Sequence, residues 1–281
     1  MSFEKVSTIL KMADEQNTSA IAFNCIDYNM CYGVIKGAEA VNKPVIIMLY
    51  PDHVTEMNIA NTAEFVGMVR GIAERATIPV GLHLDHCSDY NFIVDAIRNG
   101  FTSVMIDGSM LPVEENIQIT KKVVETAKIF GVAVEAELGH VGFAANSDQD
   151  KEDLYTTAEV AAAFCKETEV DSIAVAIGSA HGFYKETPKL DIERLKEINA
   201  ATDTPLVLHG GSGIPNDQLE LAFENGINKF NVGTEYFHLY YQSLKGYFDG
   251  AGSEGNVFDY HQEVQQILID YVKEKLSISK F

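Results

Sequence analysis

The stretch Ile78-Pro79-Val80-Gly81-Leu82-His83-Leu84-Asp85-His86 joins an apolar run to a cluster of polar side chains. Because side chains alternate between the two faces of a strand, His83 and Asp85 share one face. His86 is expected where the strand ends, since Cys87-Ser88-Asp89 is typical of a turn followed by a helix cap. The segment therefore predicts a buried strand that brings chemically active side chains to its C-terminal end.

Two further histidines follow the same pattern. His181 comes after the apolar run Ser172–Gly178, and His209 follows Pro205–Leu208. Together with His86 they are the ligand set that an open three-histidine zinc site requires. The histidines without a strand-end position are interpreted as ordinary core or surface residues, and they are His53, His140, His238 and His261.

A short apolar strand followed by a helical segment recurs along the whole chain. The expected strands are rich in β-branched residues, as in a parallel sheet buried on both faces, and they are Ala20–Phe23, Pro44–Met48, Pro79–Leu84, Ser103–Ile106, Val132–Glu137, Ser172–Ala176, Pro205–Leu208 and Lys229–Val232. Between them lie segments with helical periodicity, such as Glu114–Phe130.

Eight strand–helix units without a linker predict an α/β protein with a single (β/α)₈ barrel domain over residues 1–281. In such barrels the active site lies at the C-terminal ends of the strands. An open doubly wound sheet is the alternative, but Asn24-Cys25-Ile26-Asp27 follows the first strand, where that fold has a glycine fingerprint.

Two segments are additional to the eight strand–helix units of a barrel. The polar segment His140–Leu154 follows the fifth strand, and residues 247–281 form a C-terminal helical extension. This extension begins with a glycine-rich stretch and ends in an amphipathic helix over Phe258–Leu276. We expect that helix to cap the barrel or to pack on a partner subunit.

The composition limits the partners of the protein. Its 281 residues carry a formal net charge of −20, which repels nucleic acid and anionic membrane surfaces. The absence of a signal sequence or a long apolar run, and four cysteines without disulfide spacing, predict a reduced cytoplasmic protein. A bound phosphate would have to be held by a metal, by helix N-termini or by backbone amides.

Two glycine-rich turns offer such a phosphate site. His209-Gly210-Gly211-Ser212-Gly213-Ile214-Pro215 follows the seventh strand, and Asn231-Val232-Gly233-Thr234-Glu235 follows the eighth. The loops after these two strands are the usual phosphate site of the barrel, and Ser212 and Thr234 add hydroxyl donors. The alternative interpretation is that the glycines only satisfy the backbone geometry of tight turns.

Taken together, these motifs resemble those of class II, metal-dependent ketose-bisphosphate aldolases, most closely the fructose- and tagatose-bisphosphate branch. The resemblance spans roughly residues 5 to 275 and rests on His83-Leu84-Asp85-His86, Val134-Glu135-Ala136-Glu137-Leu138-Gly139, Ala176-Ile177-Gly178-Ser179-Ala180-His181-Gly182, Leu208-His209-Gly210-Gly211-Ser212-Gly213 and Asn231-Val232-Gly233-Thr234-Glu235.

The resemblance implies a role for each matching residue. His86, His181 and His209 become the ligands of Zn²⁺, Glu137 an alternate ligand, and Asp85 the acid/base residue. The implied contacts to a dihydroxyacetone phosphate half are Asn24, Gly182, Gly210, Gly211, Ser212, Asn231, Gly233 and Thr234. It also implies a small-molecule sugar phosphate as substrate, a monovalent cation near the phosphate, and a homodimer or homotetramer. Co²⁺ or another divalent ion would also suit three imidazoles.

The chemistry of aldol cleavage is consistent with these residues. A zinc ion held by neutral imidazoles keeps its positive charge for the enediolate that forms when the C–C bond breaks. Asp85 would take the proton of the C4 hydroxyl. A Schiff-base aldolase would instead need a lysine within a strand, but Ser172–Ala176 has none and Lys229 is expected at the wrong end of strand eight.

Several positions depart from the family pattern. Phe143 replaces the second glycine after strand five, where Asp148 and Asp150 are displaced, and Tyr50 replaces a serine or threonine after strand two. Asn256–Tyr260 lacks the usual arginine near a distal phosphate. A ketose 1,6-bisphosphate is the first expectation for the substrate, and a ketose 1-phosphate with a non-phosphorylated, carboxylated or sulfonated aldehyde half is the alternative. A zinc hydrolase, disfavoured because Asn24 replaces its usual histidines, and a non-catalytic sugar-phosphate-binding protein also remain open.

Overall fold

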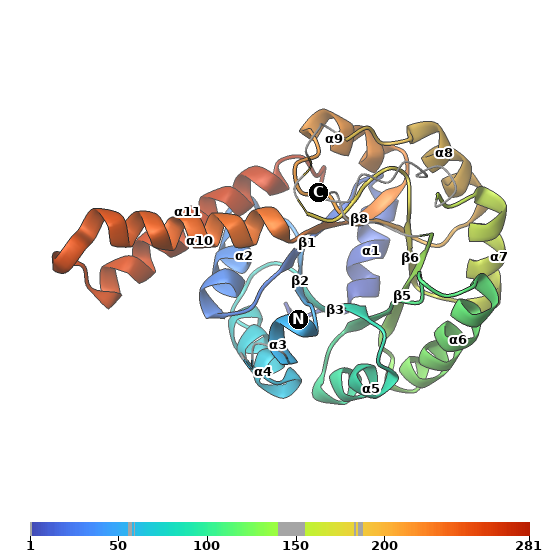
Figure 1. Ribbon diagram of the computed structural model, residues 1–281, viewed down its shortest axis with the longest axis horizontal. Coiled ribbons are helices and arrows are strands. Elements are labelled where there is room, and N and C mark those ends of the chain that lie inside the picture. Colours follow the sequence, from blue (N-terminus) through green and yellow to red (C-terminus); the bar gives the residue numbers. More distant parts are fainter. Residues whose placement is uncertain (1, 56–57, 59, 140–154, 183, 185–187) are drawn as a thin grey trace.

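Eight parallel strands form a closed barrel in the order β1 to β8, as the sequence predicts (Figure 1). The computed structural model describes residues 2–281 except 56–57, 59, 140–154, 183 and 185–187. The strands are β1 (Ala20–Asn24), β2 (Val45–Leu49), β3 (Val80–Cys87), β4 (Ser103–Ile106), β5 (Ala133–Leu138), β6 (Ser172–Val175), β7 (Leu206–Leu208) and β8 (Ile227–Val232). The pairing of β1 with β8 closes the ring, with Ile21 opposite Phe230.

A ring of helices surrounds the barrel (Figure 1). It contains α2 (Tyr28–Val41), α3 (Asp52–Thr55), α4 (Thr62–Ala73), α5 (Tyr90–Asn99), α6 (Val113–Phe130), α7 (Ala158–Thr168), α8 (Ile192–Ala201) and α9 (Asn216–Glu224), whereas α10 (Thr234–Ala251) starts at the barrel and extends away from it. Polar caps fix several helix starts. The Asp89 carboxylate accepts the backbone N–H groups of Asn91 and Phe92 at the start of α5, and the left-handed Gly100 ends the same helix.

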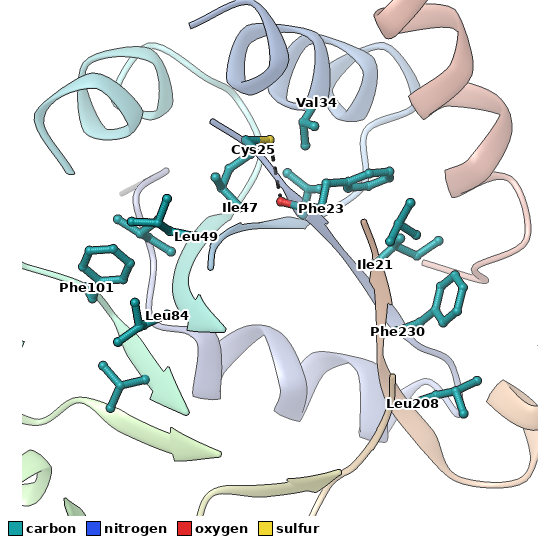
Figure 2. Close-up of a cluster of buried hydrophobic side chains, with 14 of the residues drawn as sticks. Ile21, Phe23, Cys25, Val34, Ile47, Leu49, Leu84, Phe101, Leu208 and Phe230 are labelled. Carbon is teal, nitrogen blue, oxygen red and sulfur yellow. Dashed lines mark hydrogen bonds between the residues drawn. The ribbon is translucent and has the colours of Figure 1, made fainter. Parts of the chain in front are cut away.

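Alternate strand residues face outward and form the main hydrophobic core between strands and helices. Figure 2 shows part of this core, including Ile21, Phe23, Ile47, Leu49 and Phe230. These side chains are fully buried. Because side chains alternate along a strand, the residues between these apolar positions face the barrel interior.

The interior of the barrel is apolar at its N-terminal end. Helix α1 (Val6–Glu15) lies there, inside the ring of strands in Figure 1. Its buried side chains pack against inward-facing strand residues in a second apolar cluster, made of Val6, Ile9, Leu10, Ala20, Ala22, Ile46 and Met48. A Cβ on Gly81 would lie 2.7 Å from Val6 Cγ2, so this position needs glycine for α1 to fit. The helix closes this end of the barrel.

Polar side chains occupy the middle of the barrel. The same alternation that places Gly81 against α1 places His83 one layer above it, beside Glu135 of β5 and Lys229 of β8. All three are fully buried, and Lys229 Nζ lies 2.9 Å from Glu135 Oε2. The next layer, at the C-terminal mouth, holds Asp85.

The C-terminal extension forms an arm. Helix α10 and helix α11 (Val257–Leu276), joined by a short 3₁₀ turn over Gly252–Glu254, project together from one side of the barrel (Figure 1). Near the barrel, α11 packs closely on α2, because a Cβ on Gly33 would lie 2.7 Å from the Cβ of Leu268. The expected glycine-rich loop lies largely within α10 and this turn. In the described part of the chain, no helix is long and apolar enough to cross a membrane.

Candidate active site

Three histidines converge at the C-terminal mouth of the barrel. One nitrogen of each of His86, His181 and His209 lies within 4.8 Å of the others. The His86 ring centroid is 4.9 Å from that of His181 and 4.5 Å from that of His209. The structure therefore places these three side chains at distances from which they could bind one metal ion.

His86 lies close to the end of its strand, as the sequence predicts, one residue before the last residue of β3. Strand β3 continues to Cys87, and its register with β4 shifts between Leu84 and Cys87. His86 sits in this irregularity with a φ of 44°, in the left-handed region. A non-glycine residue there costs about 1–3 kcal/mol. The irregularity turns the imidazole toward His181 and His209 instead of continuing the strand alternation.

The orientation of His209 is fixed from below. Its Nε2 donates to Glu135 Oε1 at 2.9 Å, which leaves Nδ1 to face the mouth. This Nδ1 is buried and lies 3.4 Å from Glu137 Oε2, and no group in the described part of the chain meets the geometry of a hydrogen bond to it. Burial alone would lower the pKa of His209, but the contacts with Glu135 and Glu137 raise it to about 10. A buried nitrogen aimed at carboxylate and imidazole groups is a suitable ligand for a divalent cation, so the residues fit a metal.

The lysine of strand eight is part of the support for His209. Strand β8 begins at Ile227, so Lys229 lies within the strand and not at its end, which corrects the sequence expectation. Its ammonium group contacts both oxygens of Glu135, at 3.2 and 2.9 Å. Lys229 is not among the described residues that line the cavity above.

A second potential metal-binding group shares His86. It consists of His86, Asp107 and Glu137, whose ligand atoms also lie within 4.8 Å of one another. His86 Nδ1 is 2.8 Å from Asp107 Oδ2 and 3.7 Å from Glu137 Oε2. Although burial would raise the pKa of Asp107, the hydrogen bond from His86 holds it well below the usual range. The sequence interpretation missed Asp107, whose position directly after strand Ser103–Ile106 is the signal that could have identified it.

Asp85 lies beside the three histidines and is held by two amides. Asn24 Nδ2 donates to Asp85 Oδ2 at 2.9 Å, and Asn231 Nδ2 donates to Asp85 Oδ1 at 3.1 Å. Burial acts to raise the pKa of Asp85, but the positive charges of His86 and His209 lower it to about 2. Asp85 is therefore an oriented carboxylate, ionised at neutral pH.

A cavity of about 410 Å³ opens above these groups. It is lined by Asp85, His86, His181, Glu137 and Asp107, and by all of the expected substrate contacts, which are Asn24, Gly182, Gly210, Gly211, Ser212, Asn231, Gly233 and Thr234. Among the described residues, none of those lining it is a lysine or arginine. Within the described lining, an anion would therefore find no lysine or arginine side chain.

The glycines beside the cavity have packing roles as well. A Cβ on Gly211 would lie 1.8 Å from Phe230 Cε2, and one on Gly210 would lie 2.4 Å from the Ala180 backbone. Gly182, by contrast, has a φ of 93°, and a Cβ there would meet no atom of the described residues within 4 Å. Gly210 thus meets a backbone requirement, with a φ of 68°, and Gly211 a packing requirement, while a phosphate contact at these turns stays a prediction.

The N-terminus of α10 opens onto the cavity. Helix α10 starts at Thr234 after Gly233, which makes no side-chain cap, and both residues line the cavity. Ser212 Oγ accepts the N–H of Glu235 at 3.2 Å, which ties the glycine turn after β7 to this helix. A helix N-terminus attracts an anion, and here the Ser212 hydroxyl already accepts one of its N–H groups.

One wall of the cavity is aromatic. The His53 ring packs edge-to-face on Tyr50 and on Phe237, with centroid distances of 4.9 Å in both cases. Tyr50 donates its hydroxyl to Asp52 at 2.9 Å. His53 and Phe237 line the cavity, and neither was among the expected site residues.

Two of the histidines that were not expected to be functional lie away from the cavity. His261 Nδ1 contacts Asn29 Oδ1 at 3.0 Å, between α11 and α2, and His238 is exposed on α10. Both therefore lie apart from the site, as expected. His140, Phe143, Asp148 and Asp150 lie outside the described residues.

The family model of the class-II fructose-bisphosphate aldolases matches residues 4–280 of the chain. The protein belongs to this family. It is therefore an aldolase, a carbon–carbon lyase of the class that uses a divalent metal, and not a zinc hydrolase.

Solved structures agree with this family. The chain is similar to the YdjI aldolase from Escherichia coli K12, with 32% identity, a TM-score of 0.88 and coverage of 99% of this chain and 97% of that one. The fold is also that of the fructose-bisphosphate aldolase from Campylobacter jejuni, at 22% identity, a TM-score of 0.82 and coverage of 97% and 93%.

Proposed function

We propose that this aldolase cleaves a ketose 1-phosphate reversibly into dihydroxyacetone phosphate and an aldehyde, with Zn²⁺ held by His86, His181 and His209. The convergence of these three imidazoles beside the Asp85 carboxylate supports the proposal. Co²⁺ would suit the same nitrogens. Glu137, which faces both His86 and His209, would be an alternate ligand.

The bound cation would supply Lewis acidity for the negative charge that develops on the dihydroxyacetone phosphate half. His209 reaches it in one orientation only, because Glu135 accepts the proton on Nε2. The irregular backbone at His86 similarly sets the direction of that ring. The chain thus fixes the ligand geometry before substrate binds, which lowers the reorganisation needed during the reaction.

Asp85 would exchange the proton of the substrate C4 hydroxyl. Its carboxylate is ionised, so it can accept this proton as the C–C bond breaks and return it during synthesis. The amides of Asn24 and Asn231 hold the two oxygens in place. They also leave the remaining lone pairs of both oxygens for a substrate in the cavity.

The phosphate would bind at the glycine turns after β7 and β8. The N-terminus of α10, the hydroxyls of Ser212 and Thr234, and the backbone around Gly182 surround one side of the cavity. Binding would rely on backbone N–H groups and the helix dipole, since the described lining has no lysine or arginine.

The aldehyde half would lie against the aromatic wall of Tyr50, His53 and Phe237. Burial lowers the pKa of His53, so its ring is uncharged at neutral pH. A distal phosphate carries about two negative charges and needs charge-assisted donors to bind well. We therefore propose an aldehyde without a phosphate group, in preference to the 1,6-bisphosphate that the family name suggests.

A coupled assay of dihydroxyacetone phosphate release from a panel of ketose phosphates tests both the proposed cleavage and the proposed preference for an aldehyde without a phosphate. We expect kcat/KM for a ketose 1,6-bisphosphate to exceed that for the matching 1-phosphate by less than about 10-fold. A ratio above about 10³, equivalent to roughly 4 kcal/mol, would contradict the uncharged aldehyde subsite. No release from any ketose phosphate in the presence of zinc would contradict the proposed function itself.

We also propose that the arm of α10 and α11 joins subunits into a homodimer or homotetramer. Its outer surface carries exposed aromatic residues, with Tyr241 61%, Phe248 60% and Phe258 77% exposed. Sedimentation of Phe248→Ser/Phe258→Ser should show a smaller particle than the wild type. Ile129→Ser on α6, at a position 81% exposed, is the matched control. An unchanged particle in the arm variant would exclude this surface.

A further inference from the structure

Two of the three histidines are carried by loops that touch each other directly. His181 lies in the segment between β6 and α8, and His209 directly follows β7. Gly210 has a φ of 68°, and a Cβ there would lie 2.4 Å from both the carbonyl carbon and the oxygen of Ala180. The residue before one histidine therefore packs backbone to backbone against the residue after the other.

A single hydroxyl bridges this contact. Tyr184 Oη accepts the backbone N–H of Ala180 at 2.5 Å and donates to the backbone carbonyl of Gly210 at 2.7 Å. Burial raises the pKa of Tyr184 to about 12, so the hydroxyl stays protonated and can make both bonds at once. No other side chain in the described part of the chain has a hydrogen bond to both of these backbone groups.

We propose that Tyr184 is a positioning residue that sets the separation of His181 and His209, and thereby the metal affinity and the coordination geometry of the site. Tyr184 lies three residues from His181 and makes its contacts through the backbone next to each histidine. Loss of the hydroxyl would leave an N–H and a carbonyl of the two loops without their shared partner. The loops would then be free to move apart, although each histidine would be intact.

The inference rests on the proposed metal site, and its test has readouts other than turnover. Tyr184→Phe removes the hydroxyl and keeps the ring. Competition of the metal-free protein with a chelating dye for Zn²⁺ should show affinity lowered by about 10- to 100-fold, the usual effect of losing an outer partner of a ligand. The visible absorption of the Co²⁺-loaded variant should also differ from that of the wild type, because the ligand geometry has changed.

Tyr90→Phe is the matched control. The Tyr90 hydroxyl makes one hydrogen bond of 2.8 Å, to Thr126 between α5 and α6, and Tyr90 does not line the cavity. This variant should keep the wild-type Zn²⁺ affinity and Co²⁺ spectrum. Far-ultraviolet circular dichroism of the metal-free proteins should show that both variants fold.

The outcomes separate the two proposals. A wild type that binds neither Zn²⁺ nor Co²⁺ contradicts the proposed metal site. A wild type that binds both, with the affinity and spectrum unchanged in Tyr184→Phe, contradicts only the positioning role. A Tyr184→Phe protein that is unfolded without metal also contradicts it, because a positioning role requires a folded metal-free state.

Discussion

Replacement of Asp85 by asparagine should separate the two halves of the reaction. The proposed role of Asp85 is limited to the C4 hydroxyl proton, which belongs to the aldehyde half. We expect kcat for cleavage to fall by about 10²- to 10⁴-fold, or roughly 3–5 kcal/mol, the usual effect of losing an acid/base group. Exchange of the C3 proton of dihydroxyacetone phosphate should continue, because it does not require that carboxylate.

The structure explains the choice of asparagine. Asp85 accepts hydrogen bonds from the amides of Asn24 and Asn231, and bonds to a charged group are worth about 1.5–3 kcal/mol each. Alanine would leave both buried donors without a partner and could destabilise the fold by about 2–6 kcal/mol. Asparagine keeps one acceptor oxygen, so the loss in the free energy of unfolding should be about half as large.

Three measurements on the same samples test this reasoning. Steady-state release of dihydroxyacetone phosphate gives cleavage, proton NMR in deuterium oxide gives exchange, and metal analysis gives zinc content. Asp171→Asn is the control, since the Asp171 carboxylate accepts a backbone N–H from Val134 at 2.8 Å and does not line the cavity. Loss of exchange in parallel with cleavage, at full zinc content, would refute the assignment of Asp85 to the aldehyde half. Loss of zinc would show that Asp85 supports the metal instead.

The remaining predictions concern the metal, pH and packing. Treatment with a chelator should abolish cleavage, and Zn²⁺ or Co²⁺ should restore it; full activity after verified metal removal would contradict the metal role. Burial and the charge of Lys229 lower the pKa of His83 to about 3, whereas the unfolded value is about 6.5. The contribution of the neutral His83 ring to stability is therefore complete above pH 6.5 and is lost as the pH falls toward 3. Denaturant titrations of the metal-free proteins give the free energy of unfolding at each pH. Between about pH 6.5 and 4.5, the slope of this free energy against pH should be lower in His83→Asn than in the wild type by about 1.4 kcal/mol per pH unit. Equal slopes in the two proteins would show that His83 is not buried in its neutral form. Gly211→Ala should lower the melting temperature because its Cβ would meet Phe230 at 1.8 Å, whereas Gly67→Ala, with open space in α4, should gain about 0.5–1 kcal/mol; similar effects of the two changes would contradict the packing.

Local pattern predicted the barrel well. Apolar runs located all eight strands to within three residues at each end, because a strand buried on both faces has a distinct composition. Alternation also predicted that His83 and Asp85 share one face of β3, which in the structure is the interior face. The pattern also identified His86, His181 and the glycine turns, which line one cavity, and His209, which is buried beside His86.

The features that the sequence did not predict depend on the alignment of one strand with another. The left-handed backbone of His86 occurs where the register of β3 with β4 shifts, and no residue type at this position indicates it in the sequence. The pairing of Glu135 with Lys229 joins strands that are far apart in the sequence. The aromatic wall requires the start of α10 to face α3 across the cavity, which brings Phe237 against His53. Such relations follow from barrel closure and not from local periodicity.

The enclosed polar layer has a consequence for the response of the enzyme to salt. His83, Glu135 and Lys229 are cut off from solvent by α1 below and by the mouth residues above, so dissolved ions do not screen their interactions. The surface, with its net charge of −20, is fully open to screening and repels an anionic sugar phosphate. Added salt should therefore speed the encounter with substrate and raise kcat/KM, while the field that acts on the bound substrate, and with it kcat, stays nearly constant. The catalytic step is thus shielded from dissolved ions, although the exterior of the molecule is strongly acidic.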